Sequence, residues 1–391
     1  MSSYATSTTT IGVAVETTRG TPVAPTAWVK VMSPAYKPNL TYLTDESLQG
    51  SMVAVYDNTP GLRYDAHGWN SNCYMDLLPY YVLAELGSPD TVAAAPTSTT
   101  LASSATAQAS SISTTATIAA NSWIVIDTGG LLESHYTTAV SGAGPYTVTL
   151  QYPLIYSHAS GATVTGLTGH TWSLLNNVTG TDQPPSITIT DFNGEEWRQL
   201  SASQLDKLSF TIVPDKQTSV AVTWFANPSI TPSSPSTSFS TARMAPGWTT
   251  QVSLGGSQIT YVESFSLDLA RGVKPIPAFQ GTEGYYQYFA GPITATGKMT
   301  IIEQSGSPLL NDYLNGTEQA LDVSFFDRKS GYGCRLHCSN ADFTTGAITR
   351  SKEWVEVELD VQLLPTTTDA TAGGVSPINI SIGNAVTTAY D

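Results

Sequence analysis

Cysteine and histidine are the residue types best suited to bind a metal or to act as nucleophile and base, and this sequence holds only three cysteines and five histidines. Two of the cysteines and one of the histidines lie together in one segment, Cys334-Arg-Leu-His-Cys338. On a strand, Cys334 and Cys338 would share one face and His337 would point to the other. Tetrahedral zinc needs four convergent ligands, normally as two spaced pairs, and there is no second pair. The segment therefore indicates two buried structural cysteines, and we expect no metal and no cofactor.

The other arrangements that carry catalysis give no clear candidate. A hydrolase needs a nucleophile, a histidine base and an acid, yet no histidine lies in a nucleophile elbow and no Gly-x-Ser-x-Gly occurs. Phosphate-binding loops of the P-loop or Rossmann type are absent from the sequence. Paired acids for glycoside hydrolysis are compatible with any acidic chain. However, Glu195-Glu196 and the alternating acids of residues 356–360 are typical of solvated strand faces. We therefore expect that the protein is not an enzyme.

Composition narrows the classes of partner. The 391 residues carry 16 basic and 31 acidic side chains, a formal charge of −15, which disfavours gripping nucleic acid or an anionic membrane. No apolar run approaches the roughly 20 residues of a membrane-spanning helix, so no membrane partner is expected. Residues 1–10 lack the basic start and apolar core of a Sec signal. With an odd cysteine count, this leads us to expect assembly in a reducing cytoplasm.

Periodicity predicts a mainly β protein. From residue 355, Val355, Val357, Leu359 and Val361 fall on one face and polar side chains on the other. Similar alternation occurs at residues 208–212, 220–224 and 265–269. Helical signals are few: residues 72–87 end in glycine, with Pro79 favouring a regular helix that begins near it, and residues 307–314 form a second short candidate.

Residues 91–169 differ in composition from their flanks, with 13 Ser or Thr among residues 97–117 and no Lys or Arg. Strand patterns at residues 123–126, 136–140 and 146–150 predict a small β-domain inserted between the first helix and a strand beginning at Thr171. A disordered linker is the alternative, because Ser/Thr-rich composition often means disorder.

The order of elements around the insertion indicates an internal repeat. Residues 61–69, followed by a helix ending at Gly87, correspond to residues 291–299, followed by a helix ending at Gly316. Each unit begins with a long edge segment, residues 29–39 or 259–269, and each helix is followed by three or more strands. Two unrelated β-domains remain the alternative. The predicted organisation is a first unit at 1–90 and 170–226, the insertion at 91–169, a proline-rich linker at 227–246, a second unit at 247–365 and a C-terminal arm at 366–391.

Residues 11–29, IGVAVETTRGTPVAPTAWV, resemble the opening of the tail tube (major tail) proteins of long-tailed bacteriophages. The segments at residues 48–51 and 61–69, which lead into the apolar helix, are also similar to that family. Within the insertion, Asp127-Thr-Gly129, Glu133, residues 146–150, Pro153-Leu154 and His158-Ala-Ser-Gly161 resemble an accessory β-module of such proteins. The resemblance is carried mainly by the first 170 residues.

This resemblance implies a non-enzymatic virion protein, assembled in the host bacterial cytoplasm. It implies tail-tube-type β-sandwich or half-barrel units, each with a short flanking helix, in rings that stack into a tube for double-stranded DNA. The suspected duplication favours a trimer with pseudo-sixfold symmetry over a hexamer, and we expect a non-contractile tail. Partners would be other copies of the chain and the tape measure, terminator and distal tail proteins, with DNA passing without specific binding.

The residues also predict surfaces for such an assembly. An acidic wall would repel DNA and keep it centred. Our candidates for the bore are Glu356, Glu358, Asp360, Asp268 and Asp206, although each would equally keep an outer surface soluble. We expect the loop at 41–60 and its counterpart near 275–288 to bridge stacked rings. Candidates for contact between subunits are Leu43, Tyr56, Tyr285, Tyr286, Tyr288 and Phe289.

Two other functions fit the same composition. A capsid decoration, baseplate or fibre protein would also be β-rich and acidic, but would not form tubes. A carbohydrate-binding module or adhesin would use exposed Trp and Tyr and would bind glycans as a soluble monomer.

Overall fold

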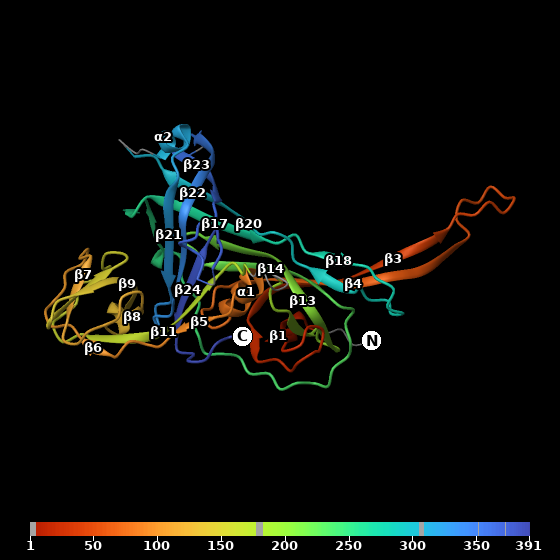
Figure 1. Cartoon of the computed structure of the whole chain (residues 1–391), viewed down its shortest axis with the longest axis horizontal. Helices are drawn as coiled ribbons and strands as arrows, with labels where there is room; N and C mark the ends of the chain where they lie inside the picture. The colour runs from red at the N-terminus through yellow and green to blue at the C-terminus, as the bar shows by residue number, and fades with distance from the viewer. Residues whose placement is uncertain (1–4, 177–182, 305–308, 351, 372) are drawn as a thin grey trace.

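The computed structural model describes residues 5–176, 183–304, 309–350, 352–371 and 373–391. It is a mainly β structure with two α-helices among the described residues, as the periodicity predicted. A long hairpin projects from one end and a small β-module lies at the other (Figure 1). Between them runs an antiparallel sheet in the order β3-β4-β14-β13-β17-β20-β23-β22. These strands are β3 (Val31–Asp45), β4 (Asp57–Asn72), β14 (Ser219–Ala226), β13 (Trp197–Ile212), β17 (Val262–Ala270), β20 (Thr294–Ile302), β23 (Glu356–Leu363) and β22 (Gly333–Thr349).

Two smaller sets of strands extend the sheet from the first halves of β13 and β22. Strand β13 pairs with β12, which pairs with β1, and β1 pairs with β2. In the same way β22 pairs with β21, β21 with β15, and β15 with β16. On its other edge, β22 also pairs with β24, which leads to β11 and β5. The bounds are β1 (Thr10–Val15), β2 (Ala27–Val29), β12 (Ile187–Phe192), β15 (Gln251–Leu254), β16 (Ser257–Ile259), β21 (Gln319–Phe326), β24 (Asn379–Asn384), β11 (Thr163–Ser173) and β5 (Thr91–Ala93).

One face of the central sheet covers the main hydrophobic core. The buried residues alternate along each strand, for example Leu208 and Phe210 on β13 and Val357, Leu359 and Val361 on β23. Helix α1 (Leu78–Leu86) packs into this core, begins beside Pro79 as predicted and ends at Gly87, whose φ of 81° suits a residue without Cβ. Helix α2 (Leu309–Asn315) ends before Gly316, and the predicted start at Ser307 lies outside the described residues. Three short 3-10 turns are η1 (Thr6–Thr8), η2 (Gly129–Leu131) and η3 (Gly247–Thr249).

Residues 91–169 form the predicted small β-structure, with its own core. Its strands are β6 (Thr99–Thr100), β7 (Ser111–Thr114), β8 (Trp123–Ile126), β9 (Glu133–Ser141) and β10 (Tyr146–Leu150). The disordered alternative is thereby wrong. Strand β11 runs through the predicted boundary at 169/170 without a break, so the strand expected to start at Thr171 is the end of the module's exit strand.

The module docks on the strands that follow α2. Trp123 packs over Gly333 and Gly383, where a Cβ would meet its ring at 2.5 Å and 2.4 Å, and its Nε1 donates to Ser381 Oγ at 3.0 Å. Tyr152 donates its hydroxyl to the Asp322 carbonyl at 2.8 Å. These contacts fix the module on β21, β22 and β24, which are distant in sequence.

The second half of the predicted C-terminal arm at 366–391 is part of the fold. Residues 379–384 form β24, which lies between β22 and β11. Ile378, Ile380 and Ile382 are buried, and Tyr390 packs against His170 and Trp172. The isoleucines alternate with polar residues, which is itself a strand pattern, and the prediction of an arm overlooked it.

The pairings of the first half of the chain recur in the second half. β1–β2, β1–β12, β12–β13, β13–β14, β14–β4 and β3–β4 correspond to β15–β16, β15–β21, β21–β22, β22–β23, β23–β20 and β17–β20. Helices α1 and α2 follow corresponding strands, β4 and β20.

The register irregularities recur at the same places. Three in the first half, between Ile187/Ile189, Leu205/Lys207 and Val31/Ser33, match three in the second, between Gln319/Leu321, Phe343/Thr345 and Val262/Ser264. A further one, between Leu40 and Tyr42 in the projecting part of β3, has no counterpart in the β17–β20 pairing. Bulges are tied to local backbone geometry and are not implied by a shared order of strands. The agreement therefore extends to individual residues.

Candidate functional site

The central sheet leaves its second face open. The register places Ser209, Asp268, Thr296 and Gln362 in one row across β13, β17, β20 and β23. The next row contains Ser266, Lys298 and Asp360, and the one after it Ser264, Thr300 and Glu358. Small polar side chains thus cover most of this surface, and none of these residues is buried. We call this surface the open face.

The charges on the open face are paired across strands. Lys207 Nζ lies 2.9 Å from Asp268 Oδ2, and Lys298 Nζ lies 2.5 Å from Glu358 Oε2. The hydrogen bond from Lys298 to Glu358 raises the pKa of the lysine. Asp360 accepts a hydrogen bond from Thr345 Oγ1 at 2.5 Å. Carboxylates thus neutralise both lysines and leave little free charge on this part of the face.

The two remaining acidic candidates have other surroundings. Glu356 shares the same side of β23 but is buried, and it accepts hydrogen bonds from Trp354 Nε1 and Lys352. A hydrogen bond with Glu263, and then the one from Lys352, lower the pKa of Glu356. Asp206 lies at the irregularity in β13, and its carboxylate accepts the Val273 amide at 2.7 Å. The structure thus brings Asp268, Glu358 and Asp360 onto one exposed surface and holds the other two in local hydrogen bonds.

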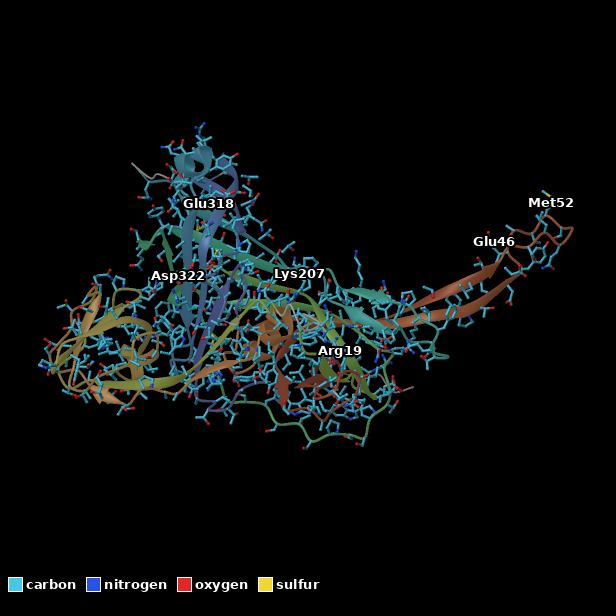
Figure 2. The ribbon with its side chains drawn as sticks, in the orientation of Figure 1. Arg19, Glu46, Met52, Lys207, Glu318 and Asp322 are labelled. Carbon is cyan, nitrogen blue, oxygen red and sulfur yellow. The ribbon has the colours of Figure 1, made fainter. Side chains whose placement is uncertain are left out.

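The projecting hairpin replaces the loop expected at 41–60. Strand β3 extends to Asp45 and β4 begins at Asp57, so only the tip is a turn. Leu43 is 64% exposed, Leu48 and Met52 are fully exposed, and the tip lies far from the rest of the chain (Figure 2). Tyr56 forms a 2.5 Å hydrogen bond with Ser51 inside the tip. Apolar side chains held this far from the core lack any cover within the described chain.

The expected counterpart at 275–288 is also a hairpin, formed by β18 (Lys274–Ile276) and β19 (Gln287–Phe289). It leans on the base of the first hairpin, where the Arg63 amide donates to the Glu283 carbonyl at 2.8 Å. Of its aromatic candidates, Tyr286 and Phe289 are exposed. Tyr288 is 1% exposed in a separate small core, and Tyr285 packs against Tyr64. Tyr288 therefore stabilises the single chain and presents no side chain to a partner.

The cysteine-histidine segment lies as its alternation predicted. Cys334 and Cys338 are buried in the core, and burial raises the pKa of Cys338 to about 12. His337 points to the other face, where its Nδ1 lies 2.8 Å from Asp322 Oδ2. Across residues 5–176, 183–304, 309–350, 352–371 and 373–391, His, Cys, Asp and Glu form no cluster suited to a metal ion.

One serine-histidine-aspartate arrangement escaped the sequence. Ser339 Oγ lies 3.3 Å from His337 Nε2, and His337 is oriented by Asp322. However, Ser339 donates its hydroxyl proton to Asp369 at the shorter distance of 2.7 Å. A nucleophile must instead offer that proton to the histidine. The arrangement is therefore a structural network, and no spacing in the sequence could have shown it, because Asp322 and Asp369 come from other segments.

A family model described as phage tail tube protein matches residues 6–362. The chain belongs to the phage tail tube protein family. Tail tube proteins are structural, typically non-enzymatic components of the virion tail. No curated protein matches this tail tube protein. In the part of the chain that the structure describes, neither helix is long and apolar enough to cross a membrane.

Proposed function

We propose that this tail tube protein assembles with copies of itself into rings, and that the rings stack into a tube through which double-stranded DNA leaves the virion. The observation that carries the proposal is the junction between β13 and β17. There, strands from the two corresponding sets of elements join into one continuous sheet. A sheet extended by this junction within a chain can be extended in the same way between chains, which removes its open edges.

We infer that the chain contains two tube units of common origin. Support comes from the matched pairings and from the three matched register irregularities. The units would be 1–90 with 170–226 and 247–365, joined by the extended segment at 227–246, with the module at 91–169 inserted in the first. Six units around an axis then require three chains, so we propose a trimer with pseudo-sixfold symmetry rather than a hexamer.

In this assembly the open face would line the bore. Small polar side chains cover it, and its lysines are held by carboxylates, so DNA phosphates would find few free cations to grip. Asp360, with Asp268 and Glu358, would supply the local negative charge. Glu356 and Asp206 become the weaker candidates, because local hydrogen bonds hold them. The projecting hairpin, with Leu43 and Tyr56, would reach a neighbouring ring, together with Tyr286 and Phe289 of the second hairpin.

The proposal places the protein in a non-contractile tail, assembled in the host bacterial cytoplasm. The ends of the tube would meet terminator and distal tail proteins, and its bore would first hold a tape measure protein. No membrane partner and no cofactor enter the scheme.

Electron microscopy of the purified protein tests this function. We expect rings or stacked tubes, with threefold symmetry in rotationally averaged end views. A chain that stays monomeric by sedimentation at every concentration and salt tested would overturn the proposal. Glycan binding by such a monomer would favour an adhesin, whereas decoration of capsids without tubes would favour another virion component.

A further inference from the structure

Two strand edges of the central sheet have no partner within the described chain. Strand β3 pairs with β4 on one side only. At residues 345–349, β22 pairs only with β23. These edges lie at opposite ends of the sheet order, so they can meet only between two copies of the chain.

The pairing of β13 with β17 inside one chain supplies a register for pairing between the free edges of β22 and β3 in two copies. In the matched pairings, β22 corresponds to β13 and β3 corresponds to β17. Transferring the β13–β17 pairing places Thr345 opposite Asn39, Gly346 opposite Pro38, Ala347 opposite Lys37, Ile348 opposite Tyr36, Thr349 opposite Ala35 and Arg350 opposite Pro34.

The exposed side chains fit this register. Ile348 corresponds to Phe210, which is fully buried beside β17, yet Ile348 itself is 48% exposed. Tyr36 of a second copy would cover it, as Leu267 covers Phe210. On the open face, Lys37 would arrive beside Ala347, whose β23 neighbour is Glu358. Burial of an apolar residue and complementary charge therefore favour the same partner, a second copy of this chain.

Prolines mark the outward edge of β3. The Arg271 amide donates to the Asp206 carbonyl, so alternate residues of β17, namely 269, 267 and 265, also direct their amides towards β13. The corresponding residues of β3 are Pro38, Tyr36 and Pro34. Proline has no N–H, so this edge offers carbonyl acceptors but lacks two of its donors.

We propose that the edge of β22 at residues 345–350 receives β3 of a second copy in this register, and that Pro34 and Pro38 make the contact one-way. The β22 edge donates and the β3 edge accepts, whereas two β3 edges would face each other with too few donors. Strand β3 can then pair only with a β22 edge, which gives the head-to-tail contact that a closed ring requires. This inference rests on the proposed function and specifies how its rings close.

A disulfide scan tests the register. Ala347 and Lys37 would form a non-hydrogen-bonded pair, whose Cα separation of about 4.5 Å permits a disulfide. We expect K37C/A347C protein, assembled and then oxidised, to give covalently linked chains on non-reducing gels. The native cysteines are buried and should not react. S209C/D268C, the equivalent pair inside one chain, is the matched positive control.

Other cysteine placements define the contrary outcomes. A35C/A347C shifts the register by two residues, and we expect little linkage between chains; efficient linkage there, or in K37C alone, would overturn the register. Tubes that form normally but give no K37C/A347C linkage would overturn the inference and leave the proposed function standing. Absence of rings and tubes in the unmodified protein would overturn both.

A second variant tests the role of the prolines. P34V/P38V restores both donors, so we expect sedimentation velocity to show a larger fraction of irregular aggregates than in the wild type. An unchanged fraction would overturn the one-way part of the inference.

Discussion

Glu85 shows how one residue can make the stability of this protein depend on pH. It lies fully buried in α1, and neither carboxylate oxygen has a hydrogen-bond partner among the residues that the structure describes. Arg271 donates instead to the backbone carbonyls of Glu85 and Leu86. Burial raises the pKa of Glu85 well above its ordinary value, although the charge of Arg271 opposes this rise. The folded state therefore favours the protonated acid.

Because the pKa of Glu85 is higher in the folded than in the unfolded state, its contribution to stability is complete below the unfolded-state pKa. This contribution is lost as the pH rises through the folded-state pKa. We expect Glu85→Gln to narrow the difference in free energy of unfolding between pH 5 and pH 8. Each tenfold decrease in the acid dissociation constant of Glu85 on folding, within the range from pH 5 to pH 8, contributes about 1.4 kcal/mol to that difference. Urea denaturation at both pH values measures it. Glu46→Gln, at the exposed hairpin tip, is the control, and an equal effect in both variants would contradict the assignment to Glu85.

At the scale of elements, the base of the β3–β4 hairpin belongs to the fold of the single chain, whereas its tip is available for contact with other copies. Its tip contributes no residue to the main core, whereas its base supplies Trp69 and Val31 to the core or its edge. The exposed apolar tip would therefore be retained for contact with other copies rather than for the stability of the single chain.

We expect deletion of residues 43–56 to leave a folded protein that no longer forms tubes. Circular dichroism and thermal unfolding would show an unchanged single-chain fold, and electron microscopy would show isolated rings or free chains. A variant of full length with Glu46 and Ser47 replaced by alanine serves as the control. Normal tubes from the deletion would exclude the hairpin from stacking.

The shape of the whole molecule agrees with a component that neighbours complete. The chain exposes 17654 Å², whereas a compact monomer of its mass would expose about 14,800 Å². The excess reflects the projecting hairpin and the module at opposite ends (Figure 1). A formal charge of −15 on the same chain disfavours DNA binding at long range, while the open face neutralises its lysines locally.

Breaking this local neutralisation should create affinity for DNA. In D268N/E358Q tubes, Lys207 and Lys298 lose their carboxylate partners, and we expect a short duplex to bind more tightly in fluorescence anisotropy. The gain should fade as salt rises, because phosphate contacts release counterions. Tubes of D215N/E195Q carry the same change in net charge on turns away from the open face. An equal gain in these control tubes would show that net charge alone decides.

Local patterns determined which residues form strands and helices. Alternation at Val357, Leu359 and Val361 predicted the buried side of β23, and Pro79 with Gly87 predicted both ends of α1, because these signals act over a few residues. The correspondence predicted between residues 61–69 and 291–299 joins the same two segments as the matched strands β4 and β20.

The tertiary structure alone decided which edges meet and which faces stay open. The position of β24 between β22 and β11 depends on strands that lie far from it in the sequence. Trp123 likewise donates to Ser381, which lies 258 positions further along the chain. The pairing of β13 with β17, and the cross-strand partners of Lys207 and Lys298, depend likewise on registers between segments that lie far apart in the sequence. Long-range strand pairing carries no signal in a single stretch of sequence, because the register depends on the residues of both strands and on which of their faces are buried together.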